Sequence, residues 1–135
     1  MQGETISVIL DTSFLVAFYD LDDDNHKRAD EFIKEFEGGK FGRLIISDYI
    51  FDETITLLKK YIGNKKTTEI GKYLLNSLEF IGMETRLFEL SWDLSKKFDE
   101  LSFTDCSIIA TMKHYNIDYL ATFDSGFNGF VKVIK

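Results

Sequence analysis

The stretch that decides the fold runs from residue 6 to residue 19 and reads ISVILDTSFLVAFY. Its first part, Ile6 to Leu10, is a near-continuous apolar run, which is the pattern of a strand buried on both faces of a sheet. Asp11 ends this run, and Phe14 to Tyr19 predicts a short helix after it. A buried strand that passes directly into a helix is typical of α/β proteins, so we expect an α/β fold.

The rest of the chain continues this alternation. Further strands are predicted at Leu44 to Ile46, Tyr119 to Thr122 and Val131 to Ile134. Further helices are predicted at Asn25 to Glu37, Asp48 to Ile62, Lys65 to Phe80, Glu89 to Leu101 and Thr104 to Tyr115. Such alternation indicates a mainly parallel sheet with both faces covered, and ligands bind beyond the carboxyl ends of its strands. The turn-like segment Gly38 to Gly42 is too short to separate domains, so we expect residues 1–135 to form one domain.

Composition and charge argue against several classes of protein. No apolar run has the length of a membrane span, and the first residues, MQGETISVIL, lack the basic region of a signal peptide. We therefore expect a cytoplasmic protein with no membrane partner. The single cysteine, Cys106, excludes an intrachain disulfide and a cysteine-based zinc site. A net charge of −7 argues against a protein that coats duplexes through many phosphate contacts.

Two acidic residues stand where a parallel sheet would place its active site. Asp11 directly follows the first strand, and Asp124 follows the strand Tyr119 to Thr122. Each has an ordinary alternative role, because aspartate is also favoured at the start of a helix or a turn. Their position makes them candidates but does not decide their role.

A third acid, Asp105, lies inside a predicted helix. It falls on the same helical face as the apolar residues Ile108, Ile109 and Met112, and in the first turn. A capping box with Ser102 would explain an acid in the first turn. It would not require that acid to lie on the apolar face.

Glu53 repeats this pattern at the border of an apolar face that consists of Ile50, Leu57, Leu58 and Tyr61. The alternative role for Glu53 is a salt bridge to Lys60 across the helix edge. Converging carboxylates repel one another, and they are tolerated when a cation neutralises them or when some are protonated. An all-oxygen ligand set suits Mg²⁺ or Mn²⁺ better than zinc.

Three segments together resemble the PIN domain family: VILDTSFLVAF, SDYIFDETITLL and LSFTDCSIIATMKHYNIDYLATFDSGF. The resemblance runs from about Ile6 to Phe127. It implies a three-layer α/β/α sandwich with a central, mainly parallel sheet, and Mg²⁺- or Mn²⁺-dependent hydrolysis of RNA phosphodiester bonds. The resemblance also implies that four acids are both the catalytic residues and the metal ligands, namely Asp11, Glu53, Asp105 and Asp124.

The same resemblance extends to partners and supporting residues. Many small prokaryotic members of this size are VapC-type toxins of toxin–antitoxin pairs, which implies an RNA substrate, an antitoxin protein and a homodimer. The hydroxyl residues Thr12, Ser13 and Thr122 are candidates for orienting a carboxylate or a phosphate. The alternative function is a non-catalytic PIN-like module that binds RNA or protein, and a small-molecule phosphatase is a more distant one.

Two other patterns have ordinary explanations. An EF-hand-like series of acids lacks the glycine of a calcium loop and fits a solvated helix start; it consists of Asp20, Asp22, Asp24 and Glu31. A group of lysines beside two tyrosines is either an RNA-binding patch or a solvated helix surface. This group consists of Lys59, Lys60, Lys65, Lys66 and Lys72, with Tyr61 and Tyr73.

Overall fold

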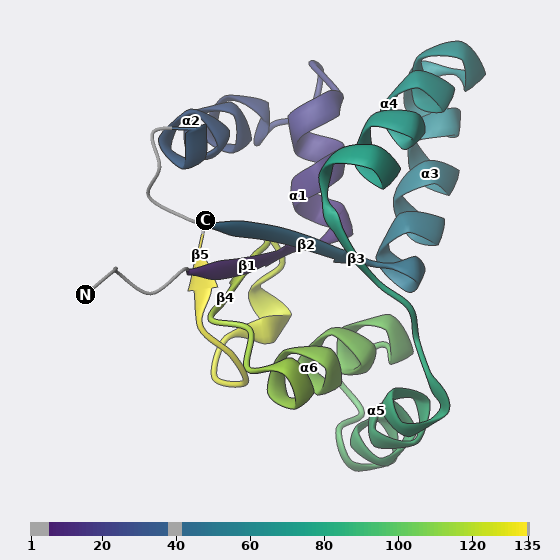
Figure 1. The fold of residues 1–135 in the computed structure, drawn as a ribbon, viewed down its shortest axis with the longest axis vertical. Coiled ribbons are helices and arrows are strands. Elements are labelled where there is room, and N and C mark those ends of the chain that lie inside the picture. Colours follow the sequence, from purple (N-terminus) through teal and green to yellow (C-terminus); the bar gives the residue numbers. More distant parts are fainter. Residues whose placement is uncertain (1–5, 38–41, 135) are drawn as a thin grey trace.

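The computed structural model describes residues 6–37 and 42–134, which build one sheet with helices on both faces (Figure 1). The strands are β1 (Ser7–Leu10), β2 (Arg43–Ser47), β3 (Glu79–Ile81), β4 (Tyr119–Ala121) and β5 (Val133–Ile134). The helices are α1 (Thr12–Tyr19), α2 (His26–Glu37), α3 (Asp48–Ile62), α4 (Asn64–Ser77), α5 (Thr85–Lys97) and α6 (Phe103–Tyr115), with a 3₁₀ turn at Ser125–Phe127. The predicted turn-like segment lies outside the described residues, except for Gly42.

The sheet has the strand order β3-β2-β1-β4-β5, and each neighbouring pair is parallel. Figure 1 shows α5 and α6 on one face and α1, α2 and α4 on the other, with α3 running beside α4. This arrangement confirms the predicted three-layer α/β/α sandwich with a parallel central sheet. The apolar run of β1 is fully buried because this strand lies in the middle of the sheet.

The predicted helix from Lys65 to Phe80 was wrong at its end. The helix α4 stops at Ser77, Leu78 is extended, and Glu79–Ile81 forms the edge strand β3. β3 pairs with Ile45–Ser47 of β2, so hydrogen bonding to a strand more than thirty positions away decides its conformation. The helix predicted from Glu89 to Leu101 is also shifted, because α5 spans Thr85–Lys97 and the chain becomes extended at Phe98.

The carboxyl ends of the three central strands lie at the same edge of the sheet and position the site. Asp11 follows β1, α3 begins directly after β2 with Ser47 as its cap, and Thr122 follows β4. The register pairs Leu10 with Ala121, which brings Asp11 level with Thr122. Across the described residues, no helix is both long and apolar enough to cross a membrane.

Candidate active site

The four predicted acids line one open cleft of about 580 Å³ at this edge of the sheet. They come from different elements: Asp11 follows β1, Glu53 lies in α3, Asp105 lies in the first turn of α6, and Asp124 precedes the 3₁₀ turn. None of the described residues that line the cleft is basic. The cleft therefore concentrates negative charge without a neighbouring cation from its own lining.

Asp11 is the most buried of these acids, with 6% of its surface exposed. Its Oδ1 accepts a hydrogen bond from the Thr12 amide at 2.8 Å. Its Oδ2 accepts from the hydroxyls of Thr122 at 2.7 Å and Ser13 at 3.1 Å. Burial raises the pKa of the Asp11 carboxyl above its ordinary value of 3.8, against the opposing effect of these hydrogen bonds. The carboxylate is thus desolvated but held in one orientation.

The two hydroxyls that contact Asp11 also fix the loop after β4. Their oxygens lie 3.0 Å apart. The Ser13 hydroxyl accepts from the Phe123 amide, and the Thr122 hydroxyl accepts from the Asp124 amide, each at 3.0 Å. Thr122 therefore links the backbone of one cleft acid to the carboxylate of another.

The Thr12 side chain points elsewhere. Its hydroxyl donates to the carbonyl oxygen of Ile50 at 3.4 Å and accepts from the Thr54 hydroxyl at 3.1 Å. It thereby joins the start of α1 to α3. Among these hydroxyl residues, Thr12 reaches Asp11 only through its backbone amide.

Asp105 both caps its helix and lines the cleft. The capping box is formed, because the Ser102 amide donates to Asp105 Oδ2 at 3.1 Å and the Asp105 amide donates to the Ser102 hydroxyl at 3.0 Å. Burial raises the pKa of the half-buried Asp105 carboxyl, the bonds with Ser102 lower it, and the nearby charge of Asp124 raises it further. The cap and the cleft position therefore coexist.

A position on the apolar face of α6 does not distinguish Asp105 from its neighbours as clearly as the helical wheel indicates. Every residue from Cys106 to Met112 is buried, so α6 is not covered on one side alone, and it packs against both α5 and α3. Asp105 meets the cleft because it lies in the first turn, where α6 begins at the edge of the sheet.

Glu53 is exposed, and the predicted apolar face of α3 is only partly buried. The buried residues of α3 are Ile50, Thr54 and Leu58. Leu57 and Tyr61 line the cleft together with Glu53. Thr54 can replace an apolar residue in the core because its hydroxyl is bonded to Thr12. In the described part of the chain, no ion pair joins Glu53 to Lys60.

Asp124 is exposed and caps the 3₁₀ turn. Its Oδ1 accepts from the Gly126 amide at 2.8 Å. The ordinary role of an aspartate at a turn is therefore present here too, beside its position in the cleft.

Sequence reasoning missed two residues of the loop between α1 and α2, Asp23 and Asn25, which also line the cleft. The Asp23 carboxylate accepts from the Asn25 amide at 2.8 Å and so shapes this loop. Asp23 is not part of the EF-hand-like series of acids, and no local sequence pattern distinguishes it from its acidic neighbours. The tertiary structure brings this loop to the cleft beside Val16 of α1.

The donor set of the cleft fits a hydrated divalent cation. All of its charged groups are carboxylates, and two of them have raised pKa values because they are desolvated. Within residues 6–37 and 42–134, no three His, Cys, Asp or Glu side chains are close enough together to enclose a metal ion. An ion bound here would complete its coordination with water, as Mg²⁺ commonly does.

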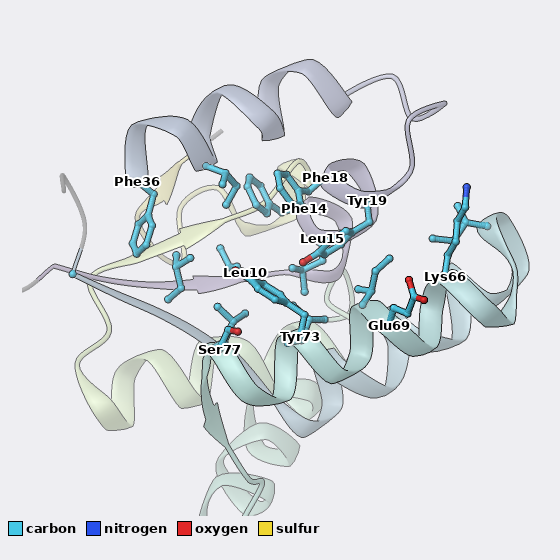
Figure 2. A pocket seen from close by; sticks show the side chains of 17 residues that line it. Leu10, Phe14, Leu15, Phe18, Tyr19, Phe36, Lys66, Glu69, Tyr73 and Ser77 are labelled. Atoms are coloured by element: carbon cyan, nitrogen blue, oxygen red, sulfur yellow. The ribbon is translucent and has the colours of Figure 1, made fainter. Parts of the chain in front are cut away.

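A second, apolar groove of about 780 Å³ lies between α4 and the pair α1 and α2 (Figure 2). Its aromatic lining includes Phe14, Phe18, Tyr19, Phe36 and Tyr73. Burial raises the pKa of Tyr19 to about 12, so its hydroxyl stays neutral in the groove. This groove shares no lining residue with the acidic cleft.

Comparisons with known proteins agree with this geometry. The family model of the PIN domain matches residues 8–132. Ribonuclease VapC6 of Methanocaldococcus jannaschii is 27% identical over 149 aligned positions, which cover 96% of this chain and 97% of the relative.

Solved structures also resemble the whole chain. VapC20 of Mycobacterium tuberculosis, a toxin that cleaves the sarcin–ricin loop, superposes with a TM-score of 0.81 and 27% identity over 95% of this chain and 99% of that one. A toxin–antitoxin complex from Klebsiella pneumoniae has a TM-score of 0.68 and 22% identity, with 95% and 96% coverage, and supports the fold alone.

Proposed function

The chain belongs to the PIN domain family, and from this premise we propose that it is a metal-dependent endoribonuclease, the toxin of a toxin–antitoxin pair. Residues 1–135 would act as one PIN-like domain. The observation that carries the proposal is the cleft lined by Asp11, Glu53, Asp105 and Asp124, on the chain positions where the family resemblance expects its acids. The similarity to a VapC ribonuclease over nearly the whole chain supports the same activity.

The proposed role of each residue follows from its contacts. Asp11, Glu53, Asp105 and Asp124 would hold Mg²⁺ or Mn²⁺ directly or through water. When bound, the ion supplies an activated water and stabilises the charge that develops on the phosphate during in-line displacement. Ser13 and Thr122 hold the Asp11 carboxylate in a fixed orientation, and the capping box does the same for Asp105.

Asp105→Asn tests this function. Asparagine keeps the side-chain oxygen that caps α6, but it removes the charge that balances a cation. We expect Mn²⁺-dependent RNA cleavage to fall by at least about 100-fold, on the scale of losing one preorganised electrostatic contact. Thermal melting without metal should show a folded variant, and the stabilisation by Mn²⁺ should be weaker than in wild type.

The matched control is Asp93→Asn, which removes an exposed carboxylate from α5. Asp93 lines neither the acidic cleft nor the apolar groove. It should cleave RNA as wild type does. If Asp105→Asn also cleaved like wild type, Asp105 would not belong to the site. If wild type bound RNA or protein without cleaving RNA in Mg²⁺ or Mn²⁺, the chain would be a non-catalytic PIN-like module.

The antitoxin is the proposed protein partner, and the apolar groove between α1, α2 and α4 offers it a surface. Structural neighbours of this chain include toxin–antitoxin complexes, such as the one from Klebsiella pneumoniae. Co-purification with the product of an adjacent reading frame tests this pairing. Tyr73→Glu, which places a charge in the groove, should weaken that complex and leave RNA cleavage unchanged.

Two further parts of the proposal concern the state of the protein. We expect a homodimer, because pairing would extend the short RNA path of a single 135-residue chain. Light scattering at assay concentrations should give twice the mass of 15.6 kDa, and the mass of one chain would contradict the dimer. We also expect a cytoplasmic location, where its RNA substrate would be present.

A further inference from the structure

A third hollow, of about 490 Å³, adjoins the acidic cleft. The two share Glu53 and Leu57 as lining residues, so one opens beside the other along α3. The remaining lining of the hollow comes from α3 and the start of α6 and consists of Tyr49, Asp52, Thr56, Phe103 and Thr104. A ligand that crosses the cleft along α3 would therefore enter this hollow next.

Aromatic rings form one side of this hollow. The ring centroids of Tyr49 and Phe103 lie 6.2 Å apart, and their planes are inclined at 44°. Phe88 of α5 packs against Phe103 from 5.3 Å. Tyr49 and Phe103 are both half-buried, so each ring is supported by the protein and still reaches the hollow.

The charges of the hollow determine what it can accept. Asp52 and Glu53 contribute two carboxylates, and none of the described lining residues carries a positive charge. A phosphate would be repelled here. A neutral planar group that stacks on an aromatic ring and donates an N–H bond to a carboxylate fits both the rings and the charges.

The helix α3 sets the spacing between the hollow and the cleft. Tyr49, Glu53, Leu57 and Tyr61 recur every four residues. Tyr49 lines the hollow, Tyr61 lines the cleft, and the two residues between them line both. One step of four residues is about 6 Å along a helix. Tyr49 is thus displaced from the cleft acid Glu53 by about the size of one nucleobase.

We propose that this hollow binds the unpaired base of a nucleotide next to the cleaved phosphodiester, by stacking on Tyr49 and Phe103. The inference rests on the proposed ribonuclease function and adds a base-binding subsite to it. Bases with an exocyclic amino group fit best, because Asp52 can accept from that group. Single-stranded RNA is commonly bound in this way, through unstacked bases on aromatic side chains.

Binding and kinetics of position-specific probes test the subsite. The probe is a series of short single-stranded RNAs in which 2-aminopurine replaces one base at each position in turn, and its fluorescence is quenched by stacking. Binding is measured with EDTA, so that metal-dependent cleavage does not remove the probe, and cleavage of the same RNAs is measured with Mn²⁺. The variants are Phe103→Leu, Tyr49→Leu and Tyr49→Phe, with melting curves for each.

The matched control is Tyr115→Leu, which removes an exposed aromatic side chain from the far end of α6 and away from both cavities. We expect wild type to quench 2-aminopurine at one position, and Phe103→Leu and Tyr49→Leu to lose this quenching. Their KM should rise about tenfold with little change in kcat, as for the loss of one base–aromatic stack. Tyr49→Phe keeps its ring and should therefore keep the quenching, and Tyr115→Leu should behave like wild type.

The remaining outcomes separate this inference from the proposed function. If wild type cleaves RNA and Phe103→Leu keeps wild-type quenching and KM, the subsite is overturned and the ribonuclease function stands. If wild type neither cleaves nor binds RNA, both fail. If Phe103→Leu changes the mass by light scattering but not RNA binding, this face joins two copies of the chain and the base-binding subsite is overturned.

Discussion

At each end of the neighbouring strands β1 and β4, one carboxylate joins the two chain segments by hydrogen bonds. We call these groups the amino-end clasp, which is Asp118 with Ser7, and the carboxyl-end clasp, which is Asp11 with Ser13 and Thr122. At the amino ends, Asp118 Oδ2 accepts from the Ser7 amide at 2.9 Å and from the Ser7 hydroxyl at 3.1 Å. At the carboxyl ends, Asp11 accepts from an amide and from the hydroxyls of Ser13 and Thr122. Both clasps use the same chemistry to join the same two strands.

The difference lies in burial and in neighbouring charge. Asp118 is exposed, whereas Asp11 is buried and faces a cleft with other acids. Desolvation raises the pKa of Asp11, and the nearby Asp105 raises it further. A carboxylate that only joined two strands would gain nothing from these surroundings. From this contrast we propose that Asp118 serves the fold alone, and that Asp11 also serves the active site.

The largest expected effect separates these two carboxylates directly. Asp11→Asn should lower Mn²⁺-dependent RNA cleavage by about 100-fold or more, because it removes an oriented charge from the cleft. Asp118→Asn should stay within about twofold of wild type, since its side chain keeps an oxygen that accepts from Ser7. Initial rates under single-turnover conditions measure both. Equal losses in the two variants would remove the functional distinction between the clasps.

A smaller effect is expected from the hydroxyl that orients Asp11. Thr122→Val keeps the shape of a fully buried side chain but removes the bond to Asp11 and the acceptor of the Asp124 amide. Loss of a group that orients a metal ligand lowers metal affinity or activity by about 10- to 100-fold. Titration with Mn²⁺, followed by cleavage rate, should show this loss.

The matched control for this variant is Thr111→Val in α6. Its hydroxyl is also buried, and it donates to the Ser107 carbonyl oxygen at 2.7 Å, away from the cleft. This variant should lose stability without losing cleavage once folded. If Thr111→Val lowered cleavage as much as Thr122→Val, the loss would reflect a buried hydroxyl in general.

The sequence predicted Asp11, the carboxylate of the carboxyl-end clasp, but it did not predict the contact between Asp118 and Ser7 at the amino ends. Asp11 follows an apolar run with the pattern of a buried strand, so its place at a strand end is a local property of the sequence. Asp118 precedes a short strand, and its partner Ser7 lies 111 positions away. That contact depends on the parallel register of β1 and β4, which no local pattern encodes.

The same distinction between local patterns and long-range contacts explains which other predictions were right and which residues were missed. The capping box of Ser102 and Asp105 forms at the start of α6 as the sequence indicates, because capping is decided within a few residues. The edge strand β3 and the cleft residue Asp23 were missed, because pairing and loop packing place them. The family resemblance supplied the grouping of acids that spacing alone left open.

The burial of Asp11 also predicts a pH dependence of stability. The pKa of the Asp11 carboxyl is raised in the folded protein above the value of 3.8 of the unfolded chain, so the folded state binds this proton more tightly. The contribution of Asp11 to the free energy of unfolding is therefore greatest below that value and is lost as pH rises through the folded pKa. Metal-free Asp11→Asn should lose less stability than wild type as pH rises through this window, as measured by urea unfolding. A wild-type slope in this variant would contradict the raised pKa.

The smallest expected effect is on the amino-end clasp. Ser7→Ala removes the hydroxyl that donates to Asp118 and accepts from the Asp118 amide at 3.0 Å. Ser7 is buried, but Asp118 is exposed and water can reach its carboxylate, so the free energy of unfolding should fall by about 1 kcal/mol. Cleavage should be unchanged, because the ladders from Ser7 to Leu10 with β2 and β4 still set the register that brings Asp11 level with Thr122. Urea unfolding and cleavage rates, measured on the same sample of Ser7→Ala, test both expectations. A folded Ser7→Ala variant with cleavage reduced tenfold or more would mean that the two ends are coupled through β1, and that the amino-end clasp also holds the site.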